Sequence, residues 1–332
     1  MDIKGGRFLV VGGAGLIGSH VVDQLLSRGA HRVLIYDNFS RGKLSNLDIA
    51  LTSSRCHLVP GTPDILDREN LRKCMLNVDG VFHLAASWLL QCNEQPRSAY
   101  DVNVMGTLMV AEAAIEAGVR RLIFSSSASV YGEPIHEPIR ESHPYLCSEI
   151  YGATKAAGEL MLRALYDRGI RRNESFRYVG LRYMNVYGPR QDDKGAYIGV
   201  ITRMLNCLDK GMSPVVHGDG SQAYDFINVR DCALANIKAM ESATVDKFYN
   251  VGTGIKTSIL DLLEIISRYY SNDFSTKFVR TDRPYVTNRV AAVGSARRDL
   301  GFEAKVPLGE GIEELINWRR NRARASQPRR AL

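Results

Sequence analysis

The chain has 332 residues, of which 45% are hydrophobic and 24% are charged, as in an ordinary soluble globular protein. This length corresponds to about two domains and excludes a small disulfide-rich scaffold, while the composition excludes a collagen-like fibre and a disordered chain. Nearly all of the net charge of +7 lies in the segment 319–330, which holds six arginines and no acidic residue. The rest of the chain is therefore not expected to bind nucleic acid.

The sequence lacks the patterns of a membrane span, a signal peptide and a paired-cysteine metal site. No apolar run reaches the roughly 18 residues that a membrane span requires, and the N-terminal segment becomes glycine-rich too early for a signal peptide. The six cysteines are scattered without a Cys-x-x-Cys pair, as is typical of a protein in a reducing compartment. We therefore expect a cytoplasmic enzyme without a metal site and without membrane insertion.

The first half of the chain alternates short apolar runs with segments of helical spacing. Continuous apolar strands that alternate with helices form a parallel sheet with both faces covered, and ligands bind at the carboxyl ends of such strands. The sequence therefore predicts an α/β fold with a Rossmann-type, doubly wound parallel sheet that binds a dinucleotide in residues 1–180. The strands are expected at 8–11, 33–36, 80–86 and 121–124, and the helices at 17–26 and 103–117.

After about residue 180 the regular alternation is lost, and loops rich in glycine interrupt shorter elements. Helical spacing returns at 259–270 and 308–322. We interpret residues 181–318 as a smaller α/β substrate-binding lobe, with a segment near 223–251 that returns to the first domain. Residues 319–332 form a basic tail without apolar periodicity, which we expect to be solvated and partly disordered. An anionic partner or a membrane surface is the alternative for this tail.

A glycine-rich turn follows the first predicted strand and opens the first predicted helix. Gly12 permits the tight turn, Gly15 lets the backbone approach a pyrophosphate, and Gly18 allows the helix to pack closely on the sheet. Asp37 lies 19 residues beyond Gly18, at the end of the second strand, where a carboxylate accepts hydrogen bonds from ribose hydroxyls. Because this carboxylate repels a 2′-phosphate, the pattern favours NAD over NADP, although the nearby Arg41 argues for NADP.

A tyrosine and a lysine are spaced for one face of a predicted helix. Tyr151 and Lys155 stand at i and i+4, so both side chains project from the same side. An ammonium group close to a phenol lowers the pKa of the phenol from about 10 and makes tyrosine a usable general base. The lysine is also expected to hydrogen-bond to the ribose of the cofactor. Ser127, at the end of a predicted strand, is then expected to hold a substrate hydroxyl, with Ser126 as the alternative.

Four motifs occur together and in order: the glycine spacing Gly-x-x-Gly-x-x-Gly, the serine run 125–127, the Tyr-x-x-x-Lys pair and Leu-Arg-Tyr-Met-Asn at 181–185. In these motifs the chain resembles the extended short-chain dehydrogenases/reductases, and within them the NAD-dependent nucleotide-sugar epimerases and dehydratases. It is most similar to the UDP-sugar 4-epimerases, over about residues 7–318. The resemblance implies a NAD cofactor, a UDP-sugar substrate and a homodimer.

The resemblance also assigns cofactor-binding residues beyond the glycines, Asp37, Tyr151 and Lys155. Two of them match positions that flank the adenine, and four others match positions that line the cofactor cleft. The flanking pair is Asp64 and Ile65, the cleft residues are Leu84, Ala85, Ala86 and Asn103, and the remaining assignments are Leu16, Ile17, Asn38, Ser40, Ser125 and Met184.

The residues predicted to bind the nucleotide-sugar lie mostly in the second half. Asn185 matches an asparagine beside the substrate diphosphate, and Arg283 lies where the family has a diphosphate-binding arginine, a role suited to a bidentate guanidinium. Arg190 is expected to add charge near the sugar or the phosphates. Tyr224 stands where the family usually has an arginine that contacts a phosphate. This contact is therefore expected to be weakened, made by the tyrosine hydroxyl instead, or made by Arg283. Trp88, beside the expected sugar position, shapes selectivity or packs in the core.

The resemblance implies removal and return of a hydride at one sugar carbon. Tyr151 takes the proton of the C4 hydroxyl, which Ser127 also holds, and hydride returns to the other face of a 4-keto sugar. Related 4,6-dehydratases carry an Asp-Glu pair after the serine position, and related uronate decarboxylases carry a glutamate there, whereas this chain has Ala128 and Ser129. Because elimination needs such an acid–base pair, the sequence predicts epimerisation at C4.

Four other functions remain as alternatives to this prediction. Dehydration, decarboxylation or 4-keto reduction would use the same fold, and a non-catalytic NAD-binding sensor would not need the intact Tyr151 and Lys155. In the homodimer that the family implies, the long helix carrying Tyr151 and the preceding helix pair between copies. An apolar surplus around Ala111, Ala114, Leu160 and Leu165 is compatible with this pairing.

Overall fold

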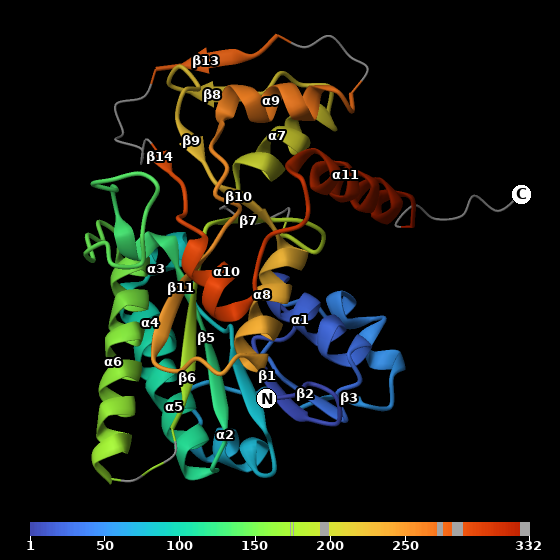
Figure 1. Cartoon of the computed structure of the whole chain (residues 1–332). Coiled ribbons are helices and arrows are strands. Elements are labelled where there is room, and N and C mark those ends of the chain that lie inside the picture. The colour runs from blue at the N-terminus through green and yellow to red at the C-terminus, as the bar shows by residue number, and fades with distance from the viewer. Residues whose placement is uncertain (173, 175, 193–198, 271–274, 281–287, 326–332) are drawn as a thin grey trace, which may run out of the picture.

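The computed structural model describes residues 1–332 except 173, 175, 193–198, 271–274, 281–287 and 326–332. Its centre is a seven-stranded sheet with the order β11-β6-β5-β4-β1-β2-β3, and every pairing in it is parallel (Figure 1). The predicted Rossmann-type α/β fold is thereby confirmed. The strands are β1 (Arg7–Val11), β2 (Arg32–Tyr36), β3 (Cys56–Leu58), β4 (Gly80–His83), β5 (Arg121–Ser127), β6 (Tyr178–Tyr183) and β11 (Lys247–Val251).

Helices cover both faces of the sheet. α1 (Leu16–Ser27) and α8 (Val229–Glu241) lie on one face, and α2 (Arg68–Met75), α5 (Gly106–Glu116) and α6 (Ile150–Arg172) lie on the other. Side chains alternate along each strand, so Phe8 and Val10 join the first core whereas Leu9 and Val11 join the second. Burial on both faces explains why the strands read as continuous apolar runs.

Short helices connect these larger elements. They are the 3-10 helices η1 (Leu44–Leu47), η2 (Ala50–Thr52) and η4 (Ala128–Tyr131), the α-helices α3 (Leu89–Glu94) and α4 (Pro96–Tyr100), and the π-helix η3 (Asp101–Met105). The π-helix continues directly into α5, so the predicted helix at 103–117 begins with a wider turn.

The second half of the chain builds a smaller layer beyond the carboxyl ends of the large sheet and returns once to that sheet through β11 (Figure 1). Buried side chains of three helices and several short strands form a separate core there. The helices are α7 (Val200–Leu208), α9 (Ile259–Ser267) and α11 (Leu308–Ala325), and α10 (Gly294–Leu300) packs on β11 and α8. The strand groups are β7 (Asn185–Tyr187) with β10 (Phe226–Asn228), β8 (Val215–His217) with β13 (Lys277–Val279), and β9 (Ala223–Tyr224) with β12 (Thr257–Ser258) and β14 (Asn288–Arg289).

The start of the predicted basic tail is helical and docked. α11 continues to residue 325, and the Arg319 guanidinium donates hydrogen bonds of 2.6 Å to the Asp209 carboxylate and to the Asn206 side chain. Arg320 donates to the backbone carbonyl of Tyr269 at 3.1 Å. The first residues of the expected tail are therefore helical, and Arg319 and Arg320 have partners outside α11, whereas residues 320, 321, 323 and 324 are exposed, as a solvated segment would be. Residues 326–332 lie outside the described part.

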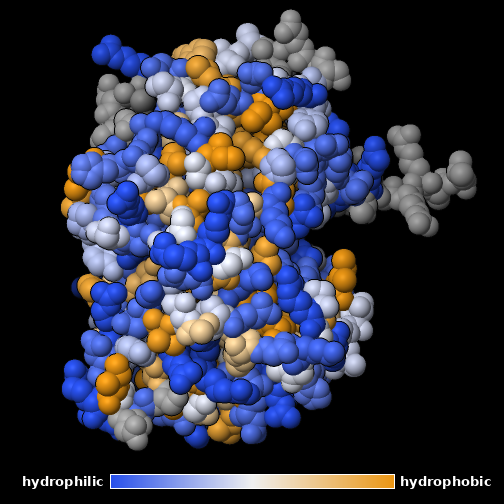
Figure 2. Space-filling view, viewed as in Figure 1, coloured by the Kyte–Doolittle hydropathy of each residue, from blue (hydrophilic) through white to orange (hydrophobic). Residues whose placement is uncertain are grey.

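The surface is mixed in character. Figure 2 shows a mostly hydrophilic face with hydrophobic side chains in small groups. Three of the four residues that suggested pairing between copies, Ala111, Ala114 and Leu165, are buried within the chain, and only Leu160 is exposed, at 53%. Within the described residues, no helix combines the length and the apolar character that crossing a membrane would require.

Candidate active site

Most of the predicted site residues lie at one edge of the large sheet. The glycine-rich turn follows β1, Asp37 follows β2, residues 84–86 follow β4, Ser127 ends β5 and Met184 follows β6 (Figure 1). Because the strands are parallel, their carboxyl ends meet at this edge, which is where open α/β sheets bind ligands.

The glycine-rich turn packs too closely against its surroundings to carry side chains at two of its glycines. Gly12 has a φ of +84°, and a Cβ atom there would lie 2.5 Å from the backbone nitrogen of Ala85. A Cβ atom on Gly18 would collide with the carbonyl oxygen of Gly12. Gly15 is the N-cap of α1 and supplies no side-chain cap, and the first turn of α1 contains no acidic residue. The backbone N–H groups at this helix end therefore suit an anion such as a pyrophosphate.

Asp37 is anchored beside this turn. Its carboxylate accepts hydrogen bonds of 2.8 Å from the N–H groups of Ala14 and Phe39. Burial raises the pKa of Asp37, and these two hydrogen bonds oppose the rise. The guanidinium carbon of Arg41, which argued for a 2′-phosphate, lies 4.6 Å from the centre of the Trp88 ring. The carboxylate is thus fixed against the turn in a position suited to ribose hydroxyls.

The residues assigned to the adenine side and the cleft are held by backbone contacts. The Tyr36 hydroxyl, at the end of β2, donates to the carbonyl of Asp64 at 2.6 Å. Ile65 packs on Gly106, where a Cβ atom would lie 2.9 Å from its side chain. The N–H groups of Leu84 and Ala85 donate to the Val11 carbonyl, and the N–H of Met184 donates to the Val251 carbonyl. The N–H of Ser40 donates to the side-chain oxygen of Asn38 at 3.0 Å.

Asn103 joins three segments at the base of the cleft. It is buried, its Oδ1 accepts from the N–H of Ser87 at 2.7 Å, and its Nδ2 donates to the Ser87 carbonyl and to the Thr154 hydroxyl at 3.0 Å each. Asn103 therefore ties the loop after β4 to the helix that carries Tyr151. Sequence reasoning missed Ser87 and Thr154, because only the folded chain brings them to Asn103.

Tyr151 and Lys155 lie on the first turns of α6, as the spacing predicts. The ammonium of Lys155 is buried, donates to the carbonyl of Ser125 at 2.8 Å and lies 5.8 Å from the centre of the Tyr151 ring. Burial lowers the pKa of Lys155 to about 8, and the neighbouring Cys92 and Glu159 oppose this shift. A lysine in this state still carries its proton in much of the enzyme at neutral pH and can support a phenolate.

The three serines of β5 have different partners. The Ser125 hydroxyl lies 3.1 Å from the Tyr183 hydroxyl, and the Ser126 hydroxyl donates to the Glu159 carboxylate on α6. Ser127 is the last residue of the strand. Its hydroxyl accepts from the N–H of Ser129 at 3.1 Å and lies 3.2 Å from the Ser129 hydroxyl. Because Ser126 is committed to Glu159 on the face toward α6, the geometry favours Ser127 for holding a substrate hydroxyl.

The residues predicted to bind the nucleotide-sugar are distributed over the smaller layer. Asn185 starts β7, where its N–H donates to the carbonyl of Asp225 at 3.0 Å. Tyr224 lies in β9 beside Arg289 of β14. Arg190 is turned toward α1, where its guanidinium lies 2.8 Å from the Asp23 carboxylate. Arg283 lies outside the described residues.

Glu159 and Arg182 are buried charged residues that sequence reasoning missed. Their side chains form an ion pair with exposed fractions of 0% and 4%. One signal in the sequence was available, since Glu159 continues the i+4 spacing of Tyr151 and Lys155 along α6. Its partner on β6 was not predictable from that spacing.

Comparisons with known proteins agree with this geometry. The model of a family described as "NAD dependent epimerase/dehydratase family" matches residues 8–252. A UDP-glucose 4-epimerase of Mycolicibacterium smegmatis is 34% identical over 323 residues, which cover 96% of this chain and 99% of that protein. A UDP-N-acetyl-alpha-D-glucosaminuronate decarboxylase of Bacillus cytotoxicus is 31% identical over 330 residues, with coverages of 94% and 97%.

A solved structure is similar over the same length. It is that of a UDP-N-acetylglucosamine 4-epimerase from Methanobrevibacter ruminantium in complex with UDP-N-acetylmuramic acid. The TM-score is 0.88 and the identity 33%, and the alignment covers 96% of this chain and 99% of the other. The likeness therefore includes the smaller layer as well as the large sheet.

Proposed function

Because the chain belongs to the NAD dependent epimerase/dehydratase family, we propose that it is a NAD-dependent epimerase that inverts C4 of a UDP-sugar. The observation that carries this proposal is the chemistry after Ser127. Ala128 is buried, and Ser129 is a hydroxyl residue whose Oγ lies 3.2 Å from the Ser127 hydroxyl. Neither residue supplies the carboxyl group that dehydration or decarboxylation would need.

The glycine turn and Asp37 fit a dinucleotide cofactor. The uncapped end of α1 would hold the pyrophosphate, and the anchored carboxylate of Asp37 would accept from the adenosine ribose. NAD, when bound there, supplies the acceptor and donor of the hydride at C4. Asn103 and Lys155 hold the cleft in shape through Ser87, Thr154 and Ser125.

The side chains of the site then transfer one proton. Tyr151 takes the proton of the C4 hydroxyl, and the ammonium of Lys155 stabilises the phenolate that does so. Ser127 holds the same hydroxyl from the end of β5. The proton returns from Tyr151 after the 4-keto sugar has presented its opposite face, so one base serves both halves of the reaction.

The smaller layer would hold the nucleotide-sugar. We assign Asn185 and Tyr224 to the diphosphate side, with Arg283 as the guanidinium donor. Arg190 is assigned to add positive charge near the sugar or the phosphates, which requires its ion pair with Asp23 to open. The contact that supports this placement is a 3.2 Å hydrogen bond from Arg289, the neighbour of Tyr224, to the carbonyl of Gly132. It joins this layer to the segment that follows Ser127.

Two further assignments accompany the function. We propose that two copies pair through α6, whose Leu160 and Ile170 side chains are exposed, and a sedimentation experiment distinguishes this dimer from a monomer.

We place the protein in the cytoplasm, a reducing compartment that suits its six free cysteines.

The test is the identity of the product in D2O. UDP-hexoses, UDP-N-acetylhexosamines and UDP-uronates are each incubated with the enzyme, and the products are followed by NMR. We expect the C4 epimer of one class without deuterium on any sugar carbon, because the hydride that leaves C4 is the one that returns. Deuterium at C5, a 4-keto-6-deoxy sugar or release of carbon dioxide would establish dehydration or decarboxylation instead.

Selectivity for NAD depends on Asp37. If its bonds to the ribose hydroxyls contribute about 1.5–3 kcal/mol, as bonds to a charged group do, Asp37→Ala weakens NAD binding roughly 10- to 150-fold. Calorimetry on enzyme freed of its cofactor measures this change. Asp37→Asn is the matched control for the anchoring bonds to Ala14 and Phe39, since its amide oxygen still accepts one of them. Tightly bound NADP in the purified wild-type protein would contradict the prediction.

A further inference from the structure

Three polar side chains form a stripe along α6. Tyr151, Lys155 and Glu159 follow one another at intervals of four residues, so they lie on one face of the helix. The mechanism above uses the first two. Glu159 is the most deeply buried of the three, with an exposed fraction of 0%, whereas a carboxylate is almost never fully buried unless it is paired.

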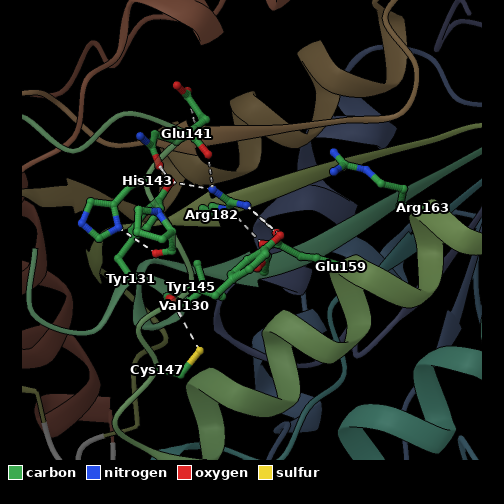
Figure 3. A network of polar contacts seen from close by, with 12 residues as sticks. Val130, Tyr131, Glu141, His143, Tyr145, Cys147, Glu159, Arg163 and Arg182 are labelled. Carbon is green, nitrogen blue, oxygen red and sulfur yellow. Dashed lines mark hydrogen bonds and ion pairs between the residues drawn. The ribbon is translucent and has the colours of Figure 1, made fainter.

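The partner of Glu159 is Arg182, near the carboxyl end of β6 (Figure 3). The Arg182 guanidinium donates to both carboxylate oxygens, with Nε at 2.9 Å from Oε1, and the Tyr145 hydroxyl donates to Oε2 at 2.7 Å. Arg182 also donates to the Tyr131 hydroxyl and to the carbonyl of Glu141, at 2.9 Å each. The charges of this pair are therefore compensated by hydrogen bonds on every side, which is the condition under which a buried ion pair is tolerated.

One further contact connects the pair to the reacting groups. The Ser126 hydroxyl donates to Glu159, and Ser126 lies directly beside Arg182 in the β5–β6 register. Its two chain neighbours are Ser125, whose carbonyl accepts from Lys155, and Ser127. The Glu159 carboxylate therefore binds β5 at Ser126, which lies between Ser125, the partner of Lys155, and Ser127 at the end of the strand.

We propose that Glu159, held by Arg182, is a positioning residue that fixes the end of β5 through Ser126 and so keeps Ser127 and Lys155 in register with Tyr151. The proposal rests on the proposed role of these three residues in hydride removal. It requires no contact between Glu159 and the substrate. Its physical basis is that a short displacement of a reacting group has a large effect on rate, of the order of 10²-fold for about 1 Å.

Electrostatics gives the same residue a second effect on Lys155. The ionisable groups around the buried ammonium are Tyr151 and Glu159 on α6, Cys92 on α3 and His83 on β4. Burial lowers the pKa of Lys155, and Cys92 and Glu159 raise it. Without the charge of Glu159, the lysine therefore loses its proton at a lower pH, even though Arg182 already neutralises part of that charge.

Two single-hydroxyl variants separate positioning from general stability. Ser126→Ala and Tyr145→Phe each remove one hydroxyl that donates to Glu159, but only Ser126 belongs to β5. The readout is the rate at which reduced NAD appears in the holoenzyme on mixing with UDP-sugar, followed by its near-ultraviolet absorbance. Hydride removal precedes epimerisation, dehydration and decarboxylation alike, so this readout is independent of which product forms, and product analysis of the wild type tests the proposed function separately.

We expect Ser126→Ala to slow hydride removal about 10-fold with KM within about twofold of the wild type, as misplacement of reacting groups predicts. Tyr145→Phe should lower the melting temperature about as much as Ser126→Ala does. It should change the rate less than about twofold, because the contact between Ser126 of β5 and Glu159 is intact. Ser126→Thr, which keeps the hydroxyl and suits a strand, should restore most of the rate. Equal rates in Ser126→Ala and Tyr145→Phe would overturn the proposal.

The pH profile provides a second, independent test. Glu159→Gln keeps the shape of the side chain but removes its charge, and we expect the alkaline fall of the rate, near pH 8 in the wild type, to move to lower pH. An unchanged profile in a folded Glu159→Gln enzyme would contradict the electrostatic part. Because removing one charge of a buried pair is strongly destabilising, the Ser126 series decides the positioning part if this variant does not fold.

Discussion

Replacing Tyr151 with phenylalanine should lower kcat by at least about 10³-fold, because it removes general-base catalysis at the C4 hydroxyl. The variant loses one hydroxyl on the first turn of α6 and keeps the ring, so the fold and NAD binding should be retained. The glycine turn and Asp37 belong to other elements and are unaffected. Steady-state epimerisation, together with the NAD content of the purified protein, measures both halves of this expectation.

Tyr100→Phe is the matched control for that experiment. Tyr100 lies on α4 with 52% of its surface exposed, so loss of its hydroxyl should leave kcat unchanged. Near-normal turnover in Tyr151→Phe would remove the assignment of Tyr151 as the base. Loss of bound NAD in the same variant would mean that the hydroxyl also holds the cofactor.

Replacing Lys155 with methionine should reduce both the rate and the affinity for NAD. Methionine has a similar length but no charge and no donor, so the Ser125 carbonyl loses its 2.8 Å hydrogen bond and the phenolate loses its cation. We expect kcat to fall about 10²- to 10³-fold, since a buried charge that supports the base is removed. The bond to the cofactor ribose should account for a further loss of roughly tenfold in NAD affinity.

Rate and affinity are measured separately in this case. kcat is determined at saturating NAD, and the dissociation constant is determined by titrating NAD into enzyme freed of cofactor. Lys238→Met, on the half-buried side of α8, is the control for replacing a lysine in a helix. A variant of Lys155 that loses rate but binds NAD normally would show that the lysine serves the tyrosine alone.

Local patterns determined much of the fold and of the candidate site. The apolar runs, the glycine turn before α1 and the i+4 spacing of Tyr151 and Lys155 each follow from a few neighbouring residues, and the parallel sheet then brings the strand ends together. Helix and strand periods are properties of short segments, so they are readable without knowledge of distant contacts. The position of Asp37 at the end of β2 is predictable for the same reason.

Only the tertiary structure decided which side chains pair across the fold. It committed Ser126 to Glu159, which lies 33 positions away, and thereby favoured Ser127. It turned Arg190 toward Asp23 and docked Arg319 on Asp209, so the first residues of the expected tail form the end of α11. Such pairings depend on how α6, α7 and α11 pack against the other elements, and packing is a long-range property that residue spacing does not encode. An arginine has the same sequence signature whether it faces water, a phosphate or a buried carboxylate, and its partner alone determines its role.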